Sequence, residues 1–461
     1  MPPLGIAYLS SFLKKNNYDV SILDLSILLY SRVDKEHKKY WNSNNGYSWY
    51  LIEDFKNLPF LTDQLYDDAV KNILSVDSDV LGFSVQNTSA LFTLEIIKRI
   101  KAKNLTKKII LGGPNCYNIS GNDFDFKLHH DLQKFSDIIV IGEGEQTLLN
   151  VLSMIGSGSS LDYCRGIAVP KDGKWFLNSP AGTISNLDDL PFPDFTAYDI
   201  GMYTSKEGNT GTNSLPILTS RGCVMKCVFC TDTYFWRPYR HRSADNVIKE
   251  IVENQRRYGN HFFSVNDSLM NGNHKNLFEL CSLIIDKKLD VLWGGNCRID
   301  KRLDVDFLKK MKKAGCEYLT IGIESGSNKI LGLMRKNFTI EETEKFLCDC
   351  DKVGIDIVAN WIVGFPGETE DDYMATKHFI IKHKDLIKIN TFSALAINQF
   401  SYLEAHKEEF GLILEGSHYG LWHSEDGLNT IELRNARLKG LEDIETNKNK
   451  SYNIVRQMTN K

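Results

Sequence analysis

The sequence predicts an α/β protein in which a parallel sheet with crossover helices precedes a partial barrel of six βα units. Short apolar runs alternate with amphipathic helical patterns twice, over residues 1–155 and 215–400, and this alternation is typical of parallel sheets. A chain of 461 residues is also too long for one core. We therefore expect a sheet domain (1–155), a hairpin and linker (156–214), a partial barrel (215–400) and a helical C-terminal segment (401–461).

The first part begins with a predicted helix, LGIAYLSSFLKKNNYDV, in which Leu4, Ala7, Tyr8 and Phe12 share one face. Predicted strands follow at VSILDLSI, VLGFSVQ, KIILGGP and DIIVIGEGE, with helices at TLEIIKRIKAKN and EQTLLNVLSMI. Ligands bind at the carboxyl ends of such strands. Because glycine-containing turns recur at successive strand ends, we expect a ligand crevice there, although each could be a plain turn. The candidate residues are Gly112, Gly113, Pro114, Gly142, Glu143, Gly144 and Glu145.

The middle of the chain predicts a hairpin around Lys171-Asp172-Gly173, followed by the aperiodic connector NLDDLPFPDFTAYDI. Barrel strands are then expected near PILTS, FFSVND, VLWGGNCRID, YLTIGIESGS, IVANWIVGFPG and NTFSALAI. Functional groups in such barrels lie at the carboxyl ends of the strands.

Composition argues against several classes of protein. The net charge is −4, with 55 basic and 59 acidic residues interspersed, so there is no basic field to hold nucleic acid. No apolar run reaches the ~18 to 20 residues of a membrane span, and no leader pattern opens the chain. We expect a cytoplasmic protein, whose ten cysteines serve as ligands, core residues or reactive groups rather than disulfides.

The segment RGCVMKCVFC carries the most specific pattern. Cys223, Cys227 and Cys230 follow Gly222 and the first predicted barrel strand. A structural zinc site needs four protein ligands, and no partner pair follows at a suitable distance. Three thiolates in one loop instead suit a cubane iron–sulfur cluster with one open iron; chance clustering of buried cysteines is the alternative.

This spacing, Cys-x-x-x-Cys-x-x-Cys with the aromatic Phe229 before the last cysteine, resembles the radical S-adenosylmethionine (SAM) superfamily over residues 215–400. The resemblance implies a [4Fe–4S] cluster whose open iron binds the amino and carboxylate groups of SAM. It also implies reductive cleavage of SAM to a 5'-deoxyadenosyl radical, with an electron donor such as flavodoxin or ferredoxin.

The same resemblance implies further SAM-binding residues at later strand ends. Asn266 and Asp267 are expected near the SAM ammonium, although the common Gly-Gly-Glu form is absent. Arg298 is expected at the SAM carboxylate, with a rim salt bridge as its alternative role. Glu324 is expected at the ribose and methionine portions of SAM, with an inward ion pair as its alternative role. The other expected positions are Ser325 and Ser327 for the ribose and methionine, and the backbone of Ile362, Val363 and Gly364 for the adenine.

The segments PPLGIAYLSSFLKKNNYDVSILD, IILGGP and DIIVIGEGE resemble the flavodoxin- or Rossmann-like cobalamin-binding domain that precedes many radical SAM barrels. The resemblance implies a corrinoid across the strand ends. Two departures stand out: there is no Asp-x-His-x-x-Gly, and the first strand of the family is missing. The second suggests a start assigned too far downstream or a degenerate domain.

Together these features predict cobalamin-dependent radical methylation of an unactivated carbon or phosphorus centre in a small-molecule or peptide substrate. A radical SAM epimerase, rearrangement or oxidation enzyme, with the first domain only a scaffold, is the alternative. A non-catalytic cluster or zinc protein is a third interpretation, against which the SAM-like strand ends argue.

Overall fold

The computed structural model describes residues 1–41, 48–49, 52–103, 106–116, 127–203, 214–415 and 421–444. The chain forms two compact units. The N-terminal unit comprises residues 2–185 and 189–204, and the C-terminal unit comprises Met1, residues 186–188 and 205–461. In the described ranges, no helix combines the length and apolarity needed to cross a membrane.

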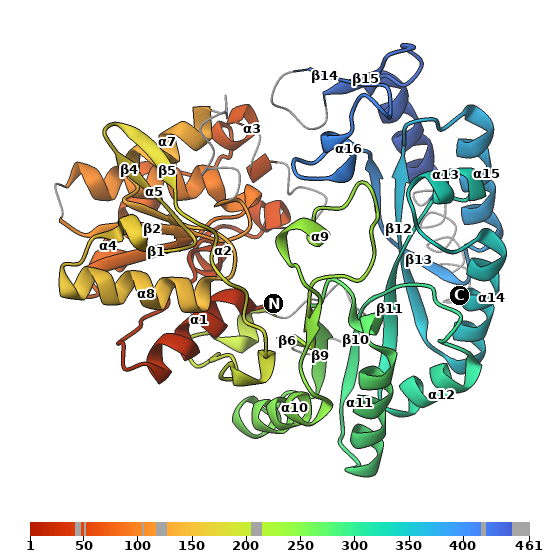
Figure 1. Ribbon diagram of the computed structural model, residues 1–461, viewed down its shortest axis with the longest axis horizontal. Helices are drawn as coiled ribbons and strands as arrows, with labels where there is room; N and C mark the ends of the chain where they lie inside the picture. Colours follow the sequence, from red (N-terminus) through yellow and green to blue (C-terminus); the bar gives the residue numbers. More distant parts are fainter. Residues whose placement is uncertain are drawn as a thin grey trace. The chain divides into compact units, whose positions relative to one another are not determined.

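The N-terminal unit is built on a five-stranded sheet of order β1-β2-β3-β4-β5 (Figure 1). Its strands are β1 (Val80–Ser84), β2 (Lys108–Gly112), β3 (Ile138–Val140), β4 (Ile167–Lys171) and β5 (Lys174–Leu177). The first three are parallel, and β4 and β5 add the hairpin that the Asp-Gly pair predicts. The parallel sheet expected in this region is therefore confirmed.

Helices cover both faces of this sheet. On one face, Ile109 and Leu111 join a core with residues of α4 (Asp63–Leu74) and α5 (Ala90–Ala102). On the other, Ile110 joins a core that includes Val151 of α8 (Gly144–Ser157). The remaining α-helices here are α1 (Leu4–Lys15), α2 (Leu25–Arg32), α3 (Ile52–Lys56) and α7 (Lys127–Phe135).

One predicted strand is wrong. Residues 20–24 have no regular structure, and Leu25–Arg32 is helix α2. The Asp24 carboxylate accepts a hydrogen bond of 3.1 Å from the Ile27 N–H, which is a helix N-cap. A strand needs a neighbour to pair with, and no strand of the described residues lies beside 20–24.

The C-terminal unit confirms the expected partial barrel. Six parallel strands follow the order β6-β9-β10-β11-β12-β13. They are β6 (Ser214–Ile217), β9 (Phe262–Val265), β10 (Leu292–Cys297), β11 (Cys316–Glu324), β12 (Asp356–Val363) and β13 (Ile387–Ala394). Outer helices cover the sheet (Figure 1): α10 (Ala244–Tyr258), α11 (His274–Asp286), α12 (Val305–Lys313), α14 (Ile340–Val353) and α15 (Glu370–Lys382).

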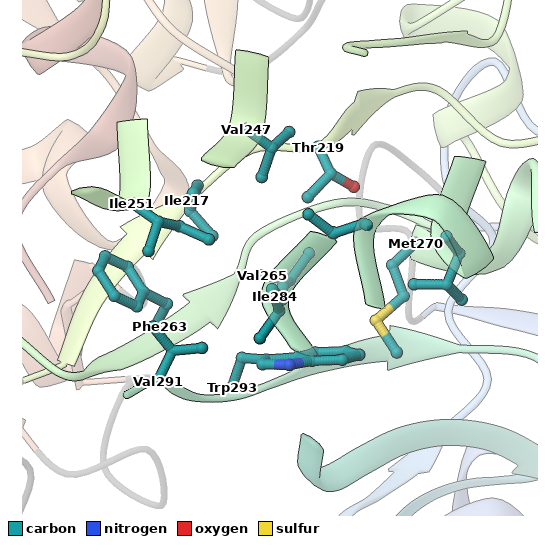
Figure 2. Close-up of a pocket in the computed structure, with 12 residues that line it drawn as sticks. Ile217, Thr219, Val247, Ile251, Phe263, Val265, Met270, Ile284, Val291 and Trp293 are labelled. Atoms are coloured by element: carbon teal, nitrogen blue, oxygen red, sulfur yellow. The ribbon is translucent and has the colours of Figure 1, made fainter. Parts of the chain in front are cut away.

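The space between this sheet and helices α10 and α11 contains a void of about 20 Å³ (Figure 2). Its lining is apolar apart from Thr219, and Val265 and Trp293 face it from the strands. A water molecule there would lack polar partners. The void is therefore a packing gap on the helix side of the sheet and offers nothing to a polar substrate.

The segment after β13 is helical at α16 (Tyr402–Ala405) and over residues 431–444, with an antiparallel ribbon between them. The ribbon pairs β14 (Leu412–Leu414) with β15 (Trp422–Ser424). This segment docks on the loop after β12: Asn429 Nδ2 donates to Gly364 O at 3.0 Å, and Arg437 pairs with Glu368 at 2.8 Å.

Candidate cluster and cofactor site

The cysteine loop is closed at its base by a short ribbon. Just beyond β6, β7 (Ser220–Arg221) pairs antiparallel with β8 (Arg240–His241), so residues 222–239 leave and rejoin the unit at one place. Gly222 opens the loop with φ +89°, and a Cβ there would lie 2.3 Å from the Trp236 carbonyl oxygen. Only glycine fits this close approach in a left-handed conformation.

Asp267 anchors the start of the cysteine loop at Thr219 and Ser220. Its side chain is 1% exposed, and its carboxylate accepts hydrogen bonds from the Thr219 N–H at 2.7 Å and the Ser220 hydroxyl at 2.7 Å. The Thr219 hydroxyl donates to it as well. Burial raises the pKa of Asp267, while these hydrogen bonds oppose the rise. The carboxylate is therefore committed to residues 219–220.

Backbone hydrogen bonds hold the tip of the loop. The Val228 N–H donates to Met334 O at 3.3 Å, and Val228 O accepts from the Leu403 N–H at 3.0 Å. Phe229 packs against the apolar cluster around Val228. The segment that carries Cys227 and Cys230 is thus fixed on both sides.

The three cysteines are free thiols of intermediate exposure. Burial raises the pKa of Cys230 to about 12 and also raises the pKa of Cys223 and Cys227, where the Lys336 charge works against burial. Over the described part of the chain, no three His, Cys, Asp or Glu side chains converge as one metal ion would require. A cubane cluster binds each thiolate through a different iron, so its ligands need not converge on one point.

Two expected SAM-binding residues face the cysteine loop or solvent. Asn266, at the end of β9, is exposed. The Arg298 guanidinium, after β10, contacts the sulfur of Met225 in the cysteine loop and pairs with Asp300 at 3.4 Å. The salt bridge expected as its alternative role is therefore present, and the side chain still borders the loop.

Glu324, at the end of β11, forms the inward ion pair that was the alternative expectation. Its partner is Lys336, with Oε1 and Nζ 3.2 Å apart. Lys336 was not predicted from the sequence, since it follows a short helix rather than a strand and no spacing rule points to it. The Lys336 ammonium lies 5.8 Å from the centre of the Phe229 ring, next to Cys230 in the sequence. Burial raises the pKa of Cys227, the Lys336 charge works against this rise, and the Glu324 charge adds to it.

The two expected serines are buried and tie two segments together. Ser325 Oγ lies 3.2 Å from Thr376 Oγ1, and the Ser327 hydroxyl donates to Asp372 at 2.7 Å. Ser327 also caps α13 (Asn328–Leu333). Their hydroxyls hold the segment after β11 against α15.

At the strand end expected to contact adenine, some of the backbone polar groups already have hydrogen-bond partners. The Gly364 N–H donates to Glu368 at 2.7 Å, and Gly364 O accepts from Asn429 at 3.0 Å. Val363 O accepts from the Leu395 N–H at 2.9 Å. Ile362 pairs with Ser393 of β13, whereas pairing with β11 stops at Trp361. Beyond Trp361, the β11 side of this strand end therefore has no pairing strand among the described residues, whereas the Val363 carbonyl is already used on the β13 side.

In the N-terminal unit, the two predicted turns follow the parallel strands β2 and β3, at one edge of the sheet. Gly113 has φ +106°, and a Cβ there would lie 2.8 Å from Val85 O. Gly142 has φ +88°, and Gly144 packs on Leu9 of α1. Glu143 and Glu145 are buried; the Glu143 carboxylate accepts from the Ile184 N–H at 2.9 Å.

Residues 217–380 match the family model of the Radical SAM superfamily. The chain carries a radical SAM domain. Such a domain implies a [4Fe–4S] cluster and SAM as cofactors and identifies the protein as a radical SAM enzyme.

Among curated relatives, an uncharacterized methyltransferase of Pyrococcus horikoshii is 27% identical over 384 residues, covering 83% of this chain and 73% of that protein. An anaerobic magnesium-protoporphyrin IX monomethyl ester cyclase of Rubrivivax gelatinosus is 28% identical, covering 80% and 60%. A cytidylyl-2-hydroxyethylphosphonate methyltransferase of Streptomyces wedmorensis is 25% identical, covering 79% and 69%.

Two solved structures share the fold of the radical SAM enzyme described here. One is TsrM, a radical SAM methyltransferase of Kitasatospora setae with cobalamin and a [4Fe–4S] cluster bound (TM-score 0.65, 17% identity, 89% of this chain and 74% of that one). The other is OxsB, a cobalamin-dependent SAM radical enzyme with aqua-cobalamin bound (TM-score 0.63, 19% identity, 89% and 53%). Because the alignments span 89% of the chain, the shared fold includes the N-terminal sheet.

Proposed function

We propose that this protein is a cobalamin-dependent radical SAM enzyme that methylates an unactivated carbon or phosphorus centre. The observation that carries the proposal is the cysteine loop at the carboxyl end of a six-stranded parallel half-barrel, joined in one chain to a parallel sheet with glycine turns at its strand ends. The methyltransferases among the relatives support the reaction type.

When bound, the cluster, SAM and cobalamin would supply radical hydrogen abstraction and methyl transfer. In this proposal Cys223, Cys227 and Cys230 hold the cluster, and Phe229 shields it from solvent. Asn266 accepts from the SAM ammonium and Arg298 donates to its carboxylate. We assign the adenine edge to the backbone of Ile362, because the Val363 carbonyl and the polar groups of Gly364 already have partners.

For the corrinoid, we propose that the backbone of Gly112, Gly113 and Pro114 and of Gly142 forms the supporting surface. Left-handed glycines without side chains permit close approach of a large planar ligand. Glu143, Gly144 and Glu145 would support that surface, since they are buried or packed within the unit. The functional domains would be residues 1–155 for cobalamin and 215–400 for radical chemistry.

The remaining partners follow from the same proposal. A cluster of this kind needs an electron, for which flavodoxin or ferredoxin is the expected donor. Free thiols at all ten cysteines suit the reducing cytoplasm. The substrate would be a small molecule or peptide and not a nucleic acid, given the net charge of −4.

A radical SAM reaction without methyl transfer is the second candidate. It is favoured by the 28% identity to an enzyme named as a cyclase. In that case the N-terminal unit would serve as a scaffold, and Ser325 and Ser327 would keep the structural role that their hydrogen bonds indicate.

Anaerobic purification from cells supplied with cobalamin tests the proposal. About four irons and one corrinoid per chain, with a labelled methyl group passing from SAM to the corrinoid, are the expected results. Full iron and SAM cleavage without corrinoid would contradict the methyltransferase proposal and favour the second candidate. A colourless zinc-bound protein would contradict both.

Substitutions at the neighbouring residues Asp267 and Asn266 distinguish a role in anchoring the cysteine loop from a role in binding SAM. We expect Asp267→Asn to lower the iron content and speed iron loss to a chelator, because an amide cannot accept all three hydrogen bonds and leaves a buried donor unpaired at ~1–3 kcal/mol. Asn266→Ala should keep its iron and weaken SAM binding. Iron analysis and SAM titration on both variants check this; full, stable iron in Asp267→Asn would contradict the anchoring role.

A further inference from the structure

Lys336 and Glu324 form a nearly buried ion pair inside the C-terminal unit. Their side chains are 12% and 9% exposed, and Nζ lies 3.2 Å from Oε1. Burying two charges is costly even when they are paired, so their position beside the cysteine loop calls for an explanation.

Backbone strain surrounds this pair. Glu324 has φ +70°, and Arg335 and Asn337, which flank Lys336, have φ +58° and +57°. None of the three is glycine, and left-handed backbone at non-glycine residues is uncommon and concentrates at functional sites. The chain therefore adopts an uncommon backbone conformation at three positions around these two charges.

The pair lies against the segment that carries the cysteines. The Val228 N–H donates to Met334 O at 3.3 Å, two residues before Lys336. The Lys336 ammonium lies 5.8 Å from the centre of the Phe229 ring, and Phe229 stands directly before Cys230.

Electrostatic effects run both ways between Lys336 and the thiols. Burial would lower the pKa of Lys336, but Glu324 and the thiols of Cys227 and Cys230 outweigh it and raise that pKa. Lys336 in turn works against the burial that raises the pKa of Cys223 and Cys227. These effects agree with the contact between Lys336 and Phe229, which places the Lys336 charge beside the cysteine segment.

We propose that Lys336 is a fixed positive charge that makes the cluster easier to reduce, and that Glu324 partly offsets it. This inference rests on the proposed cluster at Cys223, Cys227 and Cys230. Reduction adds one electron, taken from an external donor, to a centre already surrounded by thiolates. A cation held in a medium of low dielectric stabilises the more negative state of the cluster.

Redox titrations of the reconstituted full chain without SAM, followed by electron paramagnetic resonance of the reduced cluster, test the proposal. Lys336→Met should make reduction about tenfold less favourable, or ~59 mV for a one-electron couple. Glu324→Gln should shift the potential in the opposite direction. The double variant should return towards the wild type, and Lys336→Arg should keep the wild-type potential.

Lys345, which is 73% exposed on α14, provides a matched control, and Lys345→Met should leave the potential unchanged. Unchanged potentials in both single variants, or shifts in the same direction, would overturn the inference, because a purely structural pair has no reason to give opposite signs. If Lys336→Met fails to fold, Glu324→Gln still decides, because its potential should rise, and an unchanged or lower potential there would overturn the inference. Absence of a reducible cluster in the wild type would instead overturn the proposed function.

Discussion

Replacing Cys223, Cys227 or Cys230 with alanine is expected to remove most of the iron and to abolish reductive cleavage of SAM. A site with two thiolates cannot hold a cluster of four irons with one iron already left open for SAM. The loop itself should survive, because its hold on the unit comes from Asp267, from the β7–β8 pair and from the backbone of Val228. Iron content and 5'-deoxyadenosine formation measure the two losses.

Cys348→Ala is the matched control. Cys348 is exposed on α14, far along the chain from the loop, and its substitution should leave iron content and SAM cleavage at the wild-type level. If a single loop variant kept full iron and activity, that cysteine would not be a ligand and the cluster assignment would be wrong.

Most of the barrel strands could be predicted because they are apolar runs followed by a polar or glycine turn and then by a helix with clear periodicity. Orientation within a strand is less visible in the sequence. Trp293 and Trp361 lie on barrel strands, yet Trp293 Nε1 donates to Ala314 O at 2.8 Å and Trp361 packs on Phe379 of α15. Both indoles therefore face the helix layer, because strand residues alternate between faces.

The predictions that failed depend on partners distant in the sequence. The run VSILDLSI favours a strand through its β-branched and apolar residues, but Asp24 caps a helix and no described strand pairs with residues 20–24. Motif analysis cannot identify Lys336 as a site residue, since only the fold brings its side chain to Glu324. Cysteine spacing, by contrast, is local chemistry, and for that reason the loop could be recognised from the sequence alone.

Asp267 illustrates the limit of transferring roles by position. Its place after the second barrel strand suggests contact with SAM, yet its carboxylate is buried and accepts from Thr219 and Ser220. The neighbouring Asn266 is exposed at the same strand end. Both residues lie just beyond β9, where hydrogen bonds to residues 219–220 decide which side chain turns inward, and the polarity of the two residues alone cannot tell which.

Gly222→Ala is expected to be as damaging to the cluster as loss of a cysteine, although it changes no ligand. A methyl group at this position would lie 2.3 Å from Trp236 O, and the residue must keep φ +89°. The left-handed conformation costs ~1–2 kcal/mol for alanine, and the overlap with rigid backbone adds ~1–3 kcal/mol. The loop would have to open at its base, next to Cys223, so iron content after reconstitution should fall sharply.

Gly259→Ala separates the cost of the left-handed conformation from the cost of steric overlap with the backbone. Gly259 ends α10 with φ +63°, but a Cβ there meets nothing within 4 Å, so this variant bears only the conformational cost. It should unfold at a slightly lower temperature and retain its iron. Equal iron in the two variants would mean that the cysteine loop tolerates displacement of its base, and the tight closure at Gly222 would then have no part in holding the cluster.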